Sequence, residues 1–204
     1  VIMKRCACLI FALALAMPAL AEIPYPDLCS LSNPEGTDGA VVFTLPNGMG
    51  NALTDARLGG SVVNATLTLT VVNNQGDPVA AYPAADMWMI SAAGGLATCD
   101  LVHPEGPTDG NGQTTFVSPV AGGGNSLMED AQAVIEGDLV PTTAPVHFVS
   151  ADISGDLFVN LSDITVFTQD LNGTYNARCD FNADGAINLS DITLMTQGIG
   201  AVCP

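Results

Sequence analysis

Positive charge is nearly absent from this sequence. The 204 residues carry 21 Asp and Glu side chains but only four Lys and Arg, and two of these, Lys4 and Arg5, stand at the very start. After residue 21 only Arg57 and Arg178 are basic, so the formal charge of that part is 2 − 21 = −19. Such a surface repels phosphate backbones and anionic lipids, which bind clustered Lys and Arg. We therefore expect no nucleic-acid partner, and we expect divalent cations as counter-ions.

Catalytic motifs are also scarce. The two histidines, His103 and His147, lie far apart and outside any Gly-x-Ser-x-Gly or His-Glu-x-x-His motif. No glycine-rich loop opens a helix, so we expect no nucleotide. A glycosidase pair stays open, because that chemistry needs only two carboxylates about 5–10 Å apart. We expect a protein that is not an enzyme.

Long hydrophobic runs are confined to the N-terminus. Met3-Lys4-Arg5 precedes an apolar stretch over residues 6–17, and Ala19-Leu20-Ala21 forms a small-residue cleavage site. This order predicts a secretory signal peptide over residues 1–21. The apolar stretch is too short to cross a bilayer comfortably. We expect a secreted, extracellular protein, displayed on a bacterial cell surface.

Four cysteines remain after such a cleavage: Cys29, Cys99, Cys179 and Cys203. An even number in an exported chain indicates disulfides, with three possible pairings. Their positions favour Cys29–Cys99 and Cys179–Cys203. A metal–thiolate site is the alternative, but no Cys-x-x-Cys spacing supports it.

Residues 36–150 have the pattern of a β-domain. The stretch 61–74 alternates apolar and polar residues with a period of two, which is typical of a half-buried strand. Further candidate strands are 40–45, 87–91, 114–120, 131–137 and 146–150, separated by Gly, Pro and Asn turns. Residues 126–135 could instead form a short helix. Short strands between such turns predict a mainly β fold, an antiparallel β-sandwich.

This region also carries a resemblance. NATLTLTVVNNQGDPVAAYPA followed by TDGNGQTTFVSPV, within residues 60–120, is similar to bacterial Ig-like domains of the invasin/intimin kind. The resemblance implies a rigid extracellular spacer or adhesion module, an Ig-like sandwich over 36–150, and no catalysis. The segment 22–35 precedes it and could donate a strand to a neighbouring molecule, since open sheet edges favour such pairing.

Two acidic twelve-residue loops follow the β-domain. Both place short oxygen-bearing side chains at alternate positions, the spacing with which a loop supplies six to eight oxygens to calcium. The expected ligands at positions 1, 3, 5, 7, 9 and 12 are Asp152, Ser154, Asp156, Phe158, Asn160 and Asp163 in the first loop, and Asp180, Asn182, Asp184, Ala186, Asn188 and Asp191 in the second. Position 7 contributes its carbonyl, and position 9 acts through a water.

The second loop matches the pattern better than the first. Gly185 occupies the turn position of the second loop, whereas Leu157 occupies it in the first, and a left-handed leucine is costly. Ser154 is a weaker ligand than Asn182. We expect two calcium sites, and we expect the second to matter more.

A helical pattern follows each loop. Ile164, Phe167 and Leu171 recur at helical spacing, and so do Ile192, Met195 and Ile199. Loop then helix, repeated about 28 residues apart, resembles a type I dockerin over residues 151–200. That resemblance implies calcium-dependent folding and docking to cohesin domains through loop positions 10 and 11, here Leu161, Ser162, Leu189 and Ser190.

Two functions fit these observations. The first is a secreted structural or adhesive calcium-binding surface protein that polymerises with itself into a fibre, and the sequence favours it because no enzyme accompanies the calcium module. The second is anchoring of the sandwich to a cohesin-like receptor. In both, the chain divides into the signal peptide (1–21), an N-terminal segment (22–35), the sandwich (36–150) and the calcium module (151–204).

Overall fold

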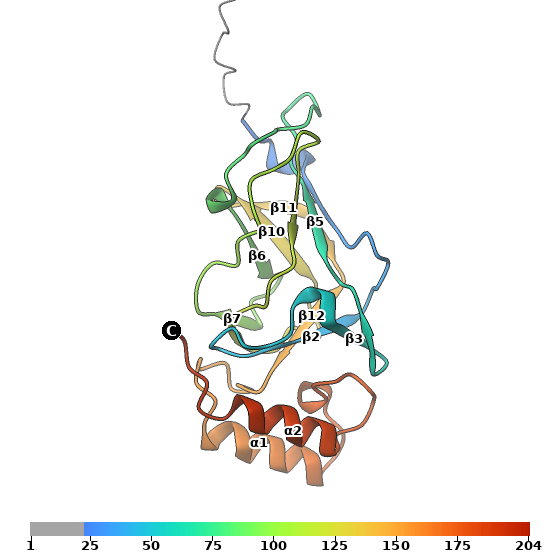
Figure 1. Cartoon of the computed structure of the whole chain (residues 1–204), viewed down its shortest axis with the longest axis vertical. Coiled ribbons are helices and arrows are strands. Elements are labelled where there is room, and N and C mark those ends of the chain that lie inside the picture. The colour runs from blue at the N-terminus through green and yellow to red at the C-terminus, as the bar shows by residue number, and fades with distance from the viewer. Residues whose placement is uncertain (1–22) are drawn as a thin grey trace, which may run out of the picture.

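The computed structural model describes residues 23–204, and the expected signal peptide lies outside this range. A β region occupies most of the molecule, and two helices lie together at its base (Figure 1). The strands are β1 (Ser30–Ser32), β2 (Ala40–Thr44), β3 (Ala56–Leu58), β4 (Ser61–Val63), β5 (Leu67–Thr70), β6 (Met87–Ser91), β7 (Leu96–Thr98), β8 (Gln113–Phe116), β9 (Gly122–Gly124), β10 (Ala131–Ile135), β11 (Asp138–Ala144) and β12 (Val146–Ser150). The helices are α1 (Leu161–Asn172) and α2 (Leu189–Gly198), with short 3-10 turns η1 (Pro26–Leu28), η2 (Leu53–Asp55), η3 (Ala84–Asp86) and η4 (Ala177–Cys179).

The strands form small sheets around one core. Their orders are β1-β5-β8, β11-β10-β6, β12-β2-β3-β4 and β7-β9. The expected alternation is confirmed in β5, where Leu67 and Leu69 are buried and Thr68 and Thr70 are partly exposed. Residues 126–135 form a turn followed by β10, so the helical alternative for this segment is wrong.

One expectation about strand pairing needs correction. β2 pairs with β12 in parallel, from Ala40 beside Val146 to Thr44 beside Ser150, so the β region is not antiparallel throughout. β1 pairs with β5 of its own chain, and the Tyr25 amide donates to the Val72 carbonyl. In the single chain the N-terminal segment therefore lies at one end of the β1-β5-β8 sheet.

The β region and the calcium module share a hydrophobic core. One cluster lies within the β region, around Leu67, Leu69, Met87 and Phe148. A second joins Phe43 of β2 to Phe167 of α1 and to Phe181 and Met195. The Phe181 ring lies 5.3 Å from that of Phe43 and 5.6 Å from that of Phe167, measured between centroids. The calcium module is packed against the β region rather than appended to it.

The disulfide differs from both expected pairs. Cys99, directly after β7, is bonded to Cys203 at the C-terminus, 104 residues away, and Figure 1 shows the chain end running back up from α2. Cys29 and Cys179 are buried free thiols. The thiol of Cys29 lies within hydrogen-bonding distance of Tyr25 and Val72, and that of Cys179 donates to Asp170. Pairing by nearness in sequence failed because the fold brings the C-terminus back to β7.

Membrane-spanning helices are not found between residues 23 and 204, since neither helix there is long and apolar enough to cross a bilayer.

Candidate calcium sites

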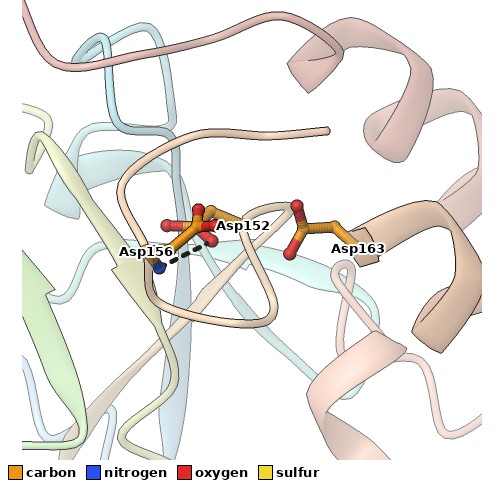
Figure 2. Close-up of side chains that lie close together, drawn as sticks. All are labelled: Asp152, Asp156 and Asp163. Atoms are coloured by element: carbon orange, nitrogen blue, oxygen red, sulfur yellow. Dashed lines mark hydrogen bonds between the residues drawn. The ribbon is translucent and has the colours of Figure 1, made fainter. Parts of the chain in front are cut away.

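The first loop brings three carboxylates together. One oxygen each from Asp152, Asp156 and Asp163 lies within 4.8 Å of the others (Figure 2). Asp152 and Asp163 are fully buried, while Asp156 is exposed. Three negative charges this close repel one another strongly unless a cation lies between them.

Backbone amides of the loop fix the first ligand. The Asp152 carboxylate accepts hydrogen bonds from the amides of Gly155, Asp156 and Leu157 at 2.9, 3.3 and 2.7 Å. The Ser154 hydroxyl also donates to it, at 3.1 Å. Burial nevertheless raises the pKa of Asp152, and repulsion from Asp163 adds to the rise. Carboxylate oxygens are among the ligands that a hard divalent ion such as calcium prefers.

The last ligand of the loop also begins the helix. Asp163 accepts from the amides of Ser154 and Asn160, and the Asn160 side chain accepts from the Ser162 amide, which completes a capping box at the start of α1. The capping box satisfies amides that a helix start leaves free. Loop closure and helix initiation therefore use the same residues.

The second loop repeats this framework. Asp191 accepts from the amides of Phe181 and Asn188, and a capping box starts α2. Asp180 accepts from the amides of Asp184 and Gly185 at 3.1 and 2.8 Å. Asp180 and Asp191 are buried, as their counterparts are in the first loop.

The side chains of the second loop are arranged differently. Within the part of the chain described, Asp180, Asp184 and Asp191 do not converge as the carboxylates of the first loop do. Asp184 is instead bonded to the amide nitrogens of Asn182 and Asn188 at 2.9 and 3.1 Å, and these bonds lower its pKa. The oxygens of these two side chains accept from backbone amides: that of Asn182 accepts from Asp184 at 3.1 Å, and that of Asn188 accepts from Ser190 at 2.8 Å in the capping box of α2.

One residue at the second loop, Tyr175, is not indicated by the sequence pattern. The Tyr175 hydroxyl donates to Asp180 at 2.8 Å. No motif marks Tyr175, which precedes the loop by five residues, so only the folded structure identifies it. The bond fixes one oxygen of Asp180 and leaves the other facing the loop amide of Asp184.

The backbone conformation of the two loops changes the interpretation of Leu157 at the turn position. Each loop has two left-handed residues, at positions 4 and 6. In the first loop these are Gly155 and Leu157, with φ of 72° and 66°; in the second they are Ala183 and Gly185, with φ of 52° and 90°. In each loop, therefore, one of the two left-handed positions is a glycine and the other is a strained residue that is not glycine. Leu157 is thus not by itself a sign of a broken loop.

The four residues at loop positions 10 and 11 lie on the surface. Leu161 and Leu189 begin their helices and are each 74 % exposed, and Ser162 and Ser190 beside them are exposed. On the opposite face, Phe167 and Met195 are buried in the shared core. The helices thus turn matching residues outward.

Comparison with known proteins agrees with the repeat. Residues 150–200 match the family model described as Dockerin type I domain. Type I dockerins bind calcium and dock to cohesins, and the match covers about a quarter of the chain. It does not extend to the β region or to its Ig-like resemblance. No curated protein matches the chain, and no solved structure matches it.

Proposed function

We propose that this protein is a secreted, non-catalytic docking protein. Residues 151–204 bind calcium at two loops and attach the β region, an Ig-like spacer or cargo, to a cohesin-type domain of another extracellular protein. One observation carries the proposal: within the dockerin match, two calcium loops each start a helix whose first residue is a leucine 74 % exposed.

Each loop offers a full set of oxygen donors to calcium. The first set is Asp152, Ser154, Asp156, the Phe158 carbonyl, Asn160 and Asp163; the second is Asp180, Asn182, Asp184, the Ala186 carbonyl, Asn188 and Asp191. Calcium would offset two of the three negative charges in each loop. The residues themselves orient those carboxylates through the loop amides and hold both helix starts in place.

The exposed starts of the two helices form the docking face. Leu161 and Leu189 supply apolar surface, and Ser162 and Ser190 supply hydrogen-bonding groups beside them. Exposed leucines rimmed by small polar residues suit an interface whose centre is apolar and whose rim is wet. Since Asp163 and Asp191 hold the same helix starts, calcium controls whether this face is presented.

Calcium binding is tested by titration calorimetry on the chain without residues 1–21. We expect two calcium ions per chain, and one after Asp156→Ala or Asp184→Ala. Asp184→Ala should lower calcium affinity more than Asp156→Ala does. It removes a ligand from the second loop, which has the better ligand set because Asn182 stands where the first loop has Ser154. Asp138→Ala, an exposed carboxylate of β11, is the matched control and should leave both sites unchanged. Absence of calcium uptake by the unmodified chain refutes the proposed function.

Docking is tested against a broad panel of purified cohesin domains, with calcium and with chelator. We expect calcium-dependent binding to at least one member. The double variant Leu161→Asp with Leu189→Asp should abolish it, whereas Leu139→Asp, at a leucine 54 % exposed on β11, should not. Equal binding by the helix variant would rule out this face.

Two observations support a role without catalysis. The Nδ1 atom of His103 lies 2.7 Å from the Met87 carbonyl, and that of His147 lies 2.9 Å from the Glu129 carbonyl. Within residues 23–204 neither ring is hydrogen-bonded to a hydroxyl, a thiol or a carboxylate, so neither forms a nucleophile–base pair there. An activity on polysaccharide, ester or peptide that one carboxylate substitution abolishes would contradict this part of the proposal.

Self-assembly into a fibre is the alternative hypothesis, and it has less support. Its proposed donor segment is paired with β5 of the same chain. Size-exclusion chromatography with and without calcium distinguishes the two hypotheses. A protein that is monomeric in both conditions and binds a cohesin fits docking alone.

A further inference from the structure

Strand β9 consists of three buried glycines and lies between β7 and the first calcium loop. On one side it pairs with β7, with Gly123 opposite Ala97. On the other side the Gly124 amide donates to the Asp152 carbonyl at 2.7 Å. All three glycines are buried. A strand without side chains permits a close approach of another part of the chain.

That approach is closest at the first calcium ligand. A Cβ atom on Gly123 would lie 1.8 Å from Oδ2 of Asp152 and 2.6 Å from its Cγ, both far inside contact distance. Any side chain at position 123 must therefore displace the Asp152 carboxylate. Because Asp152 is fully buried, β9 is one wall of the space that the carboxylate occupies.

The backbone of Asp152 is tied to the same strand. Its amide donates to the Ser150 hydroxyl at 3.1 Å, and that hydroxyl lies 3.0 Å from the Thr44 carbonyl and 3.1 Å from the Gly122 carbonyl. The Thr44 hydroxyl also reaches the Gly122 carbonyl, at 3.3 Å. These buried bonds join β2, β12 and β9 at the residue that opens the loop.

The second loop meets the β region in a different way. The Gly60 amide, in the β3–β4 turn, donates to the Ala183 carbonyl at 2.8 Å, and a Cβ on Gly60 would meet Cβ of Asp184 at 3.0 Å. This contact is made at positions 4 and 5 of the loop. The first ligand, Asp180, is held by Tyr175 of the calcium module itself.

We propose that β9 is a positioning element of the first calcium site: Gly123 and its neighbours fix the Asp152 carboxylate, so that calcium at the first loop and the β7–β9 pair stabilise each other. The proposal rests on calcium binding as the proposed function. Residues that orient metal ligands commonly govern affinity almost as strongly as the ligands do. By linkage, an ion that favours one arrangement of Asp152 favours the strand arrangement that permits it.

The test compares three glycine-to-alanine variants of the chain without residues 1–21 by calcium calorimetry. Gly123→Ala displaces Asp152 and should weaken one calcium site by roughly 10–100-fold while the other site is unchanged. Gly112→Ala is the control for a crowded glycine elsewhere in the β region, because its Cβ meets the Val71 carbonyl at 2.4 Å, away from the loop. Gly106→Ala, with nothing within 4 Å, controls for the substitution itself.

The outcomes separate this inference from the proposed function. Unmodified protein that binds no calcium refutes the proposed function, and the inference falls with it. The inference alone is overturned if the unmodified protein binds calcium and Gly123→Ala binds it as well as the unmodified protein or as well as Gly112→Ala.

A second measurement needs no glycine variant and covers the case in which Gly123→Ala fails to fold. Calcium should slow amide hydrogen exchange at Gly124 and in β7. The slowing should be greater in Asp184→Ala, which keeps the first loop intact, than in Asp156→Ala, which impairs it. Exchange in β7–β9 that does not respond to calcium, or that responds as strongly in Asp156→Ala as in Asp184→Ala, overturns the proposal.

Discussion

At the scale of single residues, Tyr82 makes the stability of the β region depend on pH in the alkaline range. Its side chain is 8 % exposed, and its hydroxyl donates to Glu136 at 2.8 Å. Burial, and then the bond to Glu136 and its charge, raise the pKa of Tyr82 above its ordinary value. A pKa raised on folding means that the folded state holds the proton more tightly. The stability from this proton is complete below the unfolded pKa of about 10 and is lost as pH rises through the folded pKa.

We therefore expect the free energy of unfolding to fall above about pH 10. Tyr82→Phe should flatten that fall and lower stability at pH 7 by about 1 kcal/mol, because the hydrogen bond is lost. Urea unfolding between pH 7 and 11 in saturating calcium measures both effects. Tyr25→Phe, at a side chain 44 % exposed, is the control. Identical pH profiles for the unmodified protein and Tyr82→Phe would contradict the assignment.

Residue roles were predictable where they depend on spacing alone. Asp152, Asp156 and Asp163 follow from a twelve-residue pattern, and the structure brings their oxygens together. Gly123 contacts Asp152 across 29 positions of sequence, and nothing in a run of glycines indicates that contact. Tyr175 lies only five residues from Asp180, but a single tyrosine carries no motif.

At the scale of elements, Phe181 holds the calcium module to the β region. It is fully buried between Phe43 of β2 and Phe167 of α1. Phe181→Ala should lower the free energy of unfolding by about 3–5 kcal/mol, because it leaves a cavity in the shared core. Phe158→Ala, at a side chain 45 % exposed in the first loop, should cost clearly less. Urea unfolding decides, and equal losses would show that the core between the two regions is loosely packed.

The sequence predicts individual strands and helices, because their residues are close together in the sequence. It does not predict which strands pair with one another. The alternation around Leu67 and Leu69 indicated β5, and the helical spacing of Phe167 and Met195 indicated α1 and α2. The parallel pairing of β2 with β12 joins segments about 100 residues apart. Alternation shows that a strand has a buried face, but it does not identify the neighbouring strand.

At the scale of the whole molecule, the Cys99–Cys203 disulfide ties the C-terminus to the β region. Its loop spans 104 residues, so reduction should lower the free energy of unfolding by about 2–5 kcal/mol in the chain-entropy account. Within residues 23–204, peptide mapping should find this bond and two free thiols, Cys29 and Cys179. Burial raises the pKa of Cys29, so that thiol should react with a thiol reagent only after unfolding. A map that links Cys29 to Cys99 would contradict the structure.

Calcium removal tests whether the molecule unfolds as one unit. A module of about fifty residues has a small core of its own, and the loop carboxylates repel one another without the ion. The sequence alone predicts that chelation melts residues 151–204 and leaves the β region intact. The shared cluster alters that expectation, because Phe43 and Val149 bury their side chains against the module. If the module opens, this apolar surface of β2 and β12 is exposed to water.

We therefore expect chelator to lower the melting temperature of the entire chain. Calcium at a hundredfold excess over Kd contributes about 2.7 kcal/mol for each site that binds only the folded form. Scanning calorimetry should show one transition that moves down in chelator. Amide exchange should quicken in β2 and β12 as well as in α1 and α2. The variant with both Asp156→Ala and Asp184→Ala is the control, and it should respond little to chelator. Two separate transitions, with the upper one indifferent to chelator, would mean that the β region folds without help from the module despite the core they share.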